Sequence, residues 1–264
     1  MAAEISFPQD FPTNFLILLR WIHFVAGIMW VGLLYFFNLV NIPFMKELDA
    51  ATKGKVMPGL MLRALWWFRV SAVVTVLAGL AYWGSIVGSD ARNAGAAPTT
   101  ALVSFLVIWT LTWAIMYGLL LIPGTGSSTA RVGADATVRP IAAWRRIFDN
   151  GWFLAILYIV IVAHSAHLFL HLNSHGWESN RLLSIGIGGG GGWMMMLSVW
   201  GIIWRIQKRL IAWTKANAEN GTPIPEQSKR MARMALLASR ANFYLSFPML
   251  FLMGAASHYP MFGG

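Results

Sequence analysis

Long hydrophobic runs separated by short polar segments form the main pattern of this chain. A helix needs about 20 apolar residues to cross about 30 Å of hydrocarbon, and six of the runs have nearly that length or more. The runs lack the strict alternation of apolar and polar residues that is typical of a half-buried strand. The pattern therefore predicts transmembrane helices at about Phe15–Leu39, Phe68–Val87, Ala101–Ile122, Trp152–Leu172, Leu182–Trp204 and Ala241–Ser257.

The composition agrees with a membrane protein. Hydrophobic residues make up 57% of the 264 positions and charged residues only 11%, whereas about 25% of the residues of a soluble domain are charged. A bundle of helices satisfies the backbone hydrogen bonds within each span. We therefore predict an all-α integral membrane protein in which residues 1–264 form a single membrane domain.

Basic residues follow alternate spans. Seventeen of the 20 lysines and arginines come after the first, third and fifth spans, and only Arg20, Arg92 and Arg181 lie on the other side. The positive-inside rule places the larger set in the cytoplasm and both termini in the periplasm of a bacterial inner membrane. The net charge of +10 then reflects orientation and contact with anionic lipid, not nucleic-acid binding. We expect the segment Arg205–Arg240 to be a solvated cytoplasmic loop.

Four of the six histidines lie in one short stretch, AHSAHLFLHLNSHG, at 163–176. His164, His167 and His171 are spaced i, i+3, i+7 and therefore share one face of a helix. Imidazoles that face lipid are costly, so we expect this face to point into the bundle. His175 follows polar residues that are expected to end the helix before it.

Histidines from three helices reach the same outer half of the membrane in this topology. His23 and His164 lie at a similar depth, about 12 Å below the outer surface for His23, and His258 lies at the outer edge. Neutral imidazole binds zinc, copper and iron, including haem iron. We predict a b-type haem with His23 and His164 as axial ligands. His258, with His167 or His171, would then bind a second haem or the propionates.

Two further features favour haem. The glycines at 188–192, with Gly189 and Gly190 at the depth of the histidines, would form a flat wall for a porphyrin. Arg20 lies one turn from His23, and it could pair with a propionate. Close packing of small residues and extension of Arg20 to the membrane surface are the alternative interpretations.

Other cofactors are restricted by the side chains present. The chain has no cysteine, which excludes disulfides, cysteine-ligated iron–sulfur clusters and c-type haem attachment. Copper is a low-ranked alternative, because five methionines near the histidines offer soft ligands: Met29, Met194, Met195, Met196 and Met253. A zinc hydrolase would need a carboxylate base, and Glu178 in the outer loop is the candidate.

Five stretches resemble the membrane domain of the cytochrome c-linked urate hydroxylase family, its N-terminal urate oxidase domain. They are RWIHFVAGIMWVGLLYFFNLVNIP (20–43), ALWWFRVSAVVTVLAGL (64–80), NGWFLAILYIVIVAHSAH (150–167), MLSVWGIIWRIQKRLIA (196–212) and ASRANFYLSFPMLFLMGAASHYP (238–260). The resemblance implies oxidation of urate to 5-hydroxyisourate, with electrons leaving through a c-type cytochrome. The matching histidines are His23, His164, His167 and His258. These 264 residues include no cytochrome domain, so we expect a separate periplasmic cytochrome c to be the partner.

The sequence thus favours a haem redox protein of the urate hydroxylase type, with His23, His164 and His258 as the candidate metal ligands. Two alternatives remain open: a non-catalytic accessory subunit of a larger membrane complex, and a copper-handling membrane protein. Besides the lipid bilayer and the cytochrome, a second copy of the chain is an open partner, as in a homo-oligomer.

Overall fold

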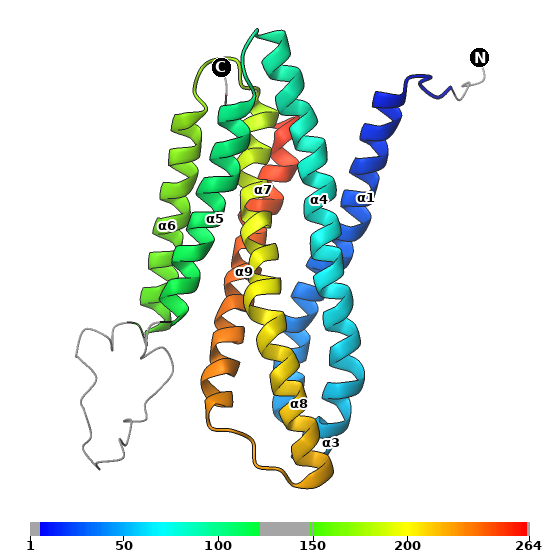
Figure 1. Ribbon diagram of the computed structural model, residues 1–264, viewed down its shortest axis with the longest axis vertical. Coiled ribbons are helices and arrows are strands. Elements are labelled where there is room, and N and C mark those ends of the chain that lie inside the picture. Colours follow the sequence, from blue (N-terminus) through cyan, green and yellow to red (C-terminus); the bar gives the residue numbers. More distant parts are fainter. Residues whose placement is uncertain (1–5, 122–147, 149, 263–264) are drawn as a thin grey trace.

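The computed structural model describes residues 6–121, 148 and 150–262, and within these ranges every regular element is a helix (Figure 1). Six helical segments of the described part are long and apolar enough to cross a membrane: Phe11–Glu47, Ala50–Asn93, Thr99–Leu121, Gly151–Leu172, Asn180–Asn220 and Gln227–His258. Each contains one predicted span, apart from Ile122 at the end of the third, which lies outside the described residues. The predicted all-α fold, with six helices long and apolar enough to cross a membrane, is confirmed for the described residues.

The six segments consist of α-helices, and in three of the segments a π-helical turn joins two α-helices. The elements are α1 (Phe11–Tyr35), η1 (Phe36–Asn41), α2 (Ile42–Glu47), α3 (Ala50–Val56), η2 (Met57–Met61), α4 (Leu62–Asn93), α5 (Thr99–Leu121), α6 (Gly151–Leu172), α7 (Asn180–Ser198), η4 (Val199–Ile203), α8 (Trp204–Asn220) and α9 (Gln227–His258). Pro43 is the second residue of α2, two residues past the end of η1, and Pro58 lies in η2. A proline removes a donor from the helical ladder, and a widened turn accommodates that loss.

Helix α7 has neighbours on several sides. It packs against α4, α5, α6 and α9, while α1 pairs with α4 and α6 pairs with α5. Helices α1 and α6 therefore lie at opposite edges of the bundle, and α1 leans away from the other helices toward its N-terminus (Figure 1). Both ends of the described chain lie at the same end of the bundle, which we call the termini end (Figure 1).

The described basic residues that were predicted to be cytoplasmic lie toward the opposite end, which we call the basic end. Four members of the predicted set, Arg131, Arg139, Arg145 and Arg146, lie outside the described residues. The side of the membrane that each end faces stays a prediction.

The prediction of a solvated loop over Arg205–Arg240 is wrong, because most of that segment is helical. Helix α8 runs to Asn220 and α9 begins at Gln227. Apolar runs mark only the part of a helix that lies in lipid, so they missed these charged extensions. The extension of α8 is packed, not solvated on all sides. Its Ile211 is buried, and a Cβ on Gly54 of α3 would lie 2.2 Å from the Cβ of Ala218.

The glycine-rich part of α7 lets aromatic side chains of two helices reach its backbone. The indole of Trp109 on α5 covers Gly190 so closely that a Cβ there would lie 2.0 Å from the ring. The same indole donates a hydrogen bond of 3.1 Å to the carbonyl of Gly186. The ring of Phe169 on α6 would lie 2.5 Å from a Cβ on Gly186. On its other side, α7 meets α9, where a Cβ on Gly188 would lie 3.2 Å from a backbone carbonyl.

Gly190→Ala is expected to destabilise the bundle, because the added methyl group overlaps the buried ring of Trp109 and the helices must separate. Overpacking of this kind costs about 1–3 kcal/mol. Thermal unfolding in detergent, followed by tryptophan fluorescence, should show a lower midpoint. Gly84→Ala is the matched control, since a Cβ at Gly84 meets no atom within 4 Å. If its unfolding midpoint fell as far as that of Gly190→Ala, the close packing of Trp109 on Gly190 would not explain the effect.

Candidate functional site

A cavity of about 570 Å³ lies between α1, α4, α7 and α9 and is lined mostly by apolar side chains. Its polar lining includes Arg20, His23, Arg181 and His258. Three of these, His23, His258 and Arg20, were predicted from the sequence as site residues, and the structure brings them to one cavity. Arg181 was not predicted as a member.

The hydrogen bond of His23 fixes which ring nitrogen is free. Its Nδ1 lies 2.7 Å from the backbone carbonyl oxygen of Thr75 on α4. A carbonyl only accepts hydrogen bonds, so Nδ1 carries the proton and Nε2 of the neutral ring presents a lone pair. Nε2 has no hydrogen-bond partner among the described residues. The hydroxyl of Thr75 is occupied separately, because it donates to Ser71.

Gly79 makes room for this imidazole. A Cβ on Gly79 would lie 2.7 Å from Nδ1 and from Cε1 of His23. The ring therefore lies directly on the backbone of α4, where it can reach the carbonyl one turn away. Sequence reasoning missed Gly79, although a small residue in an apolar helix is the usual signal of a close approach.

A hydrogen bond between α4 and α7 relates the depth of His23 to that of the α7 glycines. The indole of Trp83 on α4 donates to the carbonyl of Leu182 near the start of α7. Gly79 lies one turn deeper on α4 than Trp83, so His23 lies about 6 Å deeper than that bond. Gly189 lies about 10 Å past Leu182, which is about 4 Å deeper than His23 on the same scale, and its Cβ position is 3.7 Å from Cε of Met253. Met253, from α9, also lines the cavity.

The termini end of the cavity carries the cationic side chains. Arg20 lies one turn before His23 on α1, Arg181 in the first turn of α7, and His258 is the last residue of α9. Asn180, the first residue of α7, connects α7 to α9 at this end. Its side-chain amide donates to the carbonyl of Ala256, and its side-chain oxygen accepts from the backbone amides of Met261 and Phe262. The cavity is thus basic at this end, which we call its mouth, and mostly apolar beyond it.

The predicted inward orientation of the α6 histidines is wrong. His164, His167 and His171 are exposed, and none of them lines the cavity. The inward face of α6 is instead formed by Ser165 and Phe169, both buried. Periodicity identified one shared face correctly, but hydrogen bonding of Ser165 to Thr112 and packing of Phe169 turn the other face inward.

The predicted axial pair of His23 and His164 is therefore not assembled within one chain, because α6 and α1 lie at opposite edges of the bundle (Figure 1). The set of His23, His164 and His258 is likewise not brought together. Within the described ranges, no group of three or more histidine, aspartate and glutamate side chains is placed to bind a metal ion.

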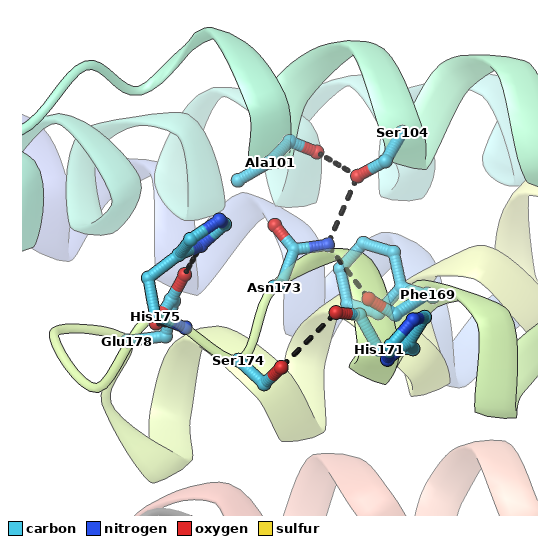
Figure 2. Close-up of polar contacts among 8 residues, drawn as sticks. All are labelled: Ala101, Ser104, Phe169, His171, Asn173, Ser174, His175 and Glu178. Carbon is cyan, nitrogen blue, oxygen red and sulfur yellow. Dashed lines mark hydrogen bonds and ion pairs between the residues drawn. The ribbon is translucent and has the colours of Figure 1, made fainter.

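The end of the histidine-rich stretch is a structural cap (Figure 2). Helix α6 ends at Leu172, and the buried amide of Asn173 donates to Ser104 at 3.0 Å and to the carbonyl of Phe169 at 2.7 Å. His175 lies past the helix, as predicted, and its Nδ1 is 2.7 Å from Glu178. The Glu178 carboxylate is buried and also accepts from the backbone amide of His175. These contacts hold the loop between α6 and α7 in place.

The two predicted glycines have different surroundings. Gly189 lines the cavity, whereas Gly190 is covered by Trp109 and faces away from it. Gly190 is therefore not exposed to this cavity, and close helix packing explains this glycine. Met194 and Met195 are buried in the core and do not line the cavity.

Asn180→Ala is expected to free the chain after α9 from the mouth of the cavity. The amides of Met261 and Phe262 lose their acceptor, so their hydrogen exchange should become at least about tenfold faster, which corresponds to about 1.4 kcal/mol of local opening. Hydrogen–deuterium exchange mass spectrometry checks this. Asn220→Ala at the basic end is the control; equal exchange in both variants would contradict the role of Asn180.

Comparison of the chain with models of protein families, with curated proteins and with solved structures finds no match.

Proposed function

We propose that this chain is a membrane redox protein that binds a b-type haem in the cavity between α1, α4, α7 and α9. The observation that supports this most directly is the orientation of His23. Histidines that bind metals commonly donate their other ring N–H to a carbonyl, which fixes the tautomer and strengthens the ligand. The bond from His23 to the backbone of Thr75 has this form, and it leaves Nε2 for haem iron.

The cavity fits the remaining parts of such a cofactor. Its volume of about 570 Å³ lies within the roughly 300–1,000 Å³ of cofactor sites. Apolar walls suit a macrocycle, and the guanidinium groups of Arg20 and Arg181 at the mouth suit its propionates. Trp30 also lines the cavity, and its buried indole N–H has no acceptor among the described residues. A bound group with an acceptor atom would satisfy that donor.

Met253 is the second ligand that we propose, in place of His164. It lies on α9 beside Gly189, within about one helical turn of the depth of His23, whereas His258 lies five residues nearer the mouth, about 7.5 Å away along the helix. His258 would then contact a propionate or a substrate. A haem bound in this way supplies a one-electron couple, while the protein excludes water and holds the charged groups at the surface.

Urate is the electron donor that the resemblance to the urate hydroxylase family suggests. Urate is a planar anion, and the basic mouth of the cavity would attract it. Its oxidation to 5-hydroxyisourate removes two electrons, adds a hydroxyl group from water and releases two protons, so two molecules of ferricytochrome c would be reduced. The distribution of basic residues supports placing the mouth in the periplasm of a bacterial inner membrane, where that cytochrome resides.

Copper binding is a second candidate function for the same cavity. Met249 and Met253 line it together with His23 and His258, and thioether sulfur with imidazole is a ligand set that suits copper. Metal analysis of the purified protein separates the two proposals. Copper without a Soret band would favour this second candidate. A protein that binds neither haem nor copper would retain only an accessory role in a larger membrane complex.

Purified wild-type protein is expected to show a Soret band and to give a b-type pyridine haemochrome, and His23→Ala is expected to lose both. Gly79→Ala should also lower the haem content strongly, because its methyl group displaces the His23 ring from the Thr75 carbonyl. His164→Ala and Gly84→Ala are the matched controls and should keep the wild-type content. Absence of haem from wild-type protein, or its loss in the controls alone, would overturn the proposal.

Met253→Leu is expected to retain haem bound by His23 but to change the spectrum and lower the reduction potential, since a methionine ligand raises it. His258→Ala should leave the ligand-dependent features of the spectrum in place and weaken urate-dependent reduction of cytochrome c. Optical redox titration and a cytochrome c assay measure the two effects. The assignment of Met253 fails if its variant matches wild type while His258→Ala loses the second ligand.

A further inference from the structure

The histidine row of α6, which we define as His164, His167 and His171, lies on the face of the helix that this chain leaves uncovered. At about 100° per residue, the row is centred roughly 150° around the helix from the buried stripe formed by Ser165 and Phe169. The row therefore points away from the bundle. It makes no use of the cavity residues, so its role is separate from the proposed haem site.

The rest of the exposed face of α6 is apolar. Toward the basic end it presents Ile156, Ile159 and Val160, which are 61%, 64% and 57% exposed, as expected for a surface in contact with lipid. The row occupies only the half of the helix near the termini end. Polar groups in hydrocarbon need hydrogen-bond partners or a metal, and ionisable residues in membrane helices rarely face lipid. A protein surface is therefore expected to cover this half of α6.

We propose that the row is an interface between two copies of this chain, and that the paired rows bind one transition-metal ion that prefers imidazole, such as Zn²⁺. The membrane holds two copies at the same depth and in the same orientation, so a two-fold axis along the membrane normal places each histidine opposite its counterpart. A neutral imidazole is both donor and acceptor, and the row is therefore complementary to itself. A different partner would need its own matching polar row at the same depth.

The spacing of the row suits metal binding by two helices. His167 and His171 are i, i+4 neighbours, the helical spacing at which two imidazoles can bind one zinc ion. One helix supplies two ring nitrogens, and a tetrahedral structural site takes four ligands, so the second copy completes it. This pair lies in the last two turns of α6, where an ion can enter from water. His164, one turn deeper, would bond to its counterpart.

The absence of cysteine from the sequence allows the interface to be tested by a single introduced thiol. Leu168→Cys places the thiol at the edge of the row. Leu77→Cys is the matched control, because Leu77 on α4 is 58% exposed. In lipid nanodiscs or native membranes, a short bismaleimide should link two copies through position 168 and not through position 77. Equal cross-linking at both positions, or none at 168, would overturn the dimer.

Zinc titration of the purified protein after chelator treatment tests the metal. Wild-type protein in lipid should bind one Zn²⁺ per two chains, and cross-linking at Leu168→Cys should increase when Zn²⁺ is added. His167→Ala with His171→Ala should lose this ion, while His23→Ala should keep it, which separates this site from the haem cavity. No bound zinc, one ion per chain, or unchanged binding in the double variant would overturn the metal site, whatever the haem content.

Discussion

The packing of this bundle depends on the missing side chains of α7. Lipid supplies little hydrophobic drive for helices to associate, so contact between backbones and side chains must provide the attraction. The rings of Phe169 and Trp109 pack directly on Gly186 and Gly190, and the backbone of α9 lies close to Gly188. Through these contacts α5, α6 and α9 pack against α7. Gly189 and Gly192 face the remaining side, where the cavity lies, so one run of glycines both closes the core and leaves a wall without side chains.

The two groups of histidines lie in very different surroundings because of that arrangement. The ring of His23 packs against α4 and bonds to a backbone carbonyl there, while the row on α6 lies at the far edge of the bundle. A membrane interior penalises unpaired polar groups wherever they lie. The protein therefore meets the same requirement in two ways: internally at His23, and through a surface that needs a partner at the row.

Hydropathy predicted the spans well because the thickness of the bilayer, a fixed physical length, sets the length of each apolar run. Periodicity also grouped His164, His167 and His171 on one face. It could not give the direction of that face, because a polar stripe is compatible with either the interior or an interface between proteins. Thr75 and Gly79 were missed for another reason. Every residue type supplies the backbone carbonyl that Thr75 offers, and a glycine such as Gly79 indicates a close approach without identifying the side chain that approaches it. The extension of the fifth span into α8 was not predicted, because its charged residues interrupt the apolar run.

The bond from His23 to a main-chain carbonyl has a consequence for how this protein can vary. Every residue type supplies the same carbonyl, so position 75 can change its side chain without altering the tautomer of the imidazole. Position 79 has no such freedom, since any Cβ there meets the ring. Among relatives that keep a histidine at position 23, we therefore expect the glycine at position 79 to be kept as well, while the residue at position 75 varies.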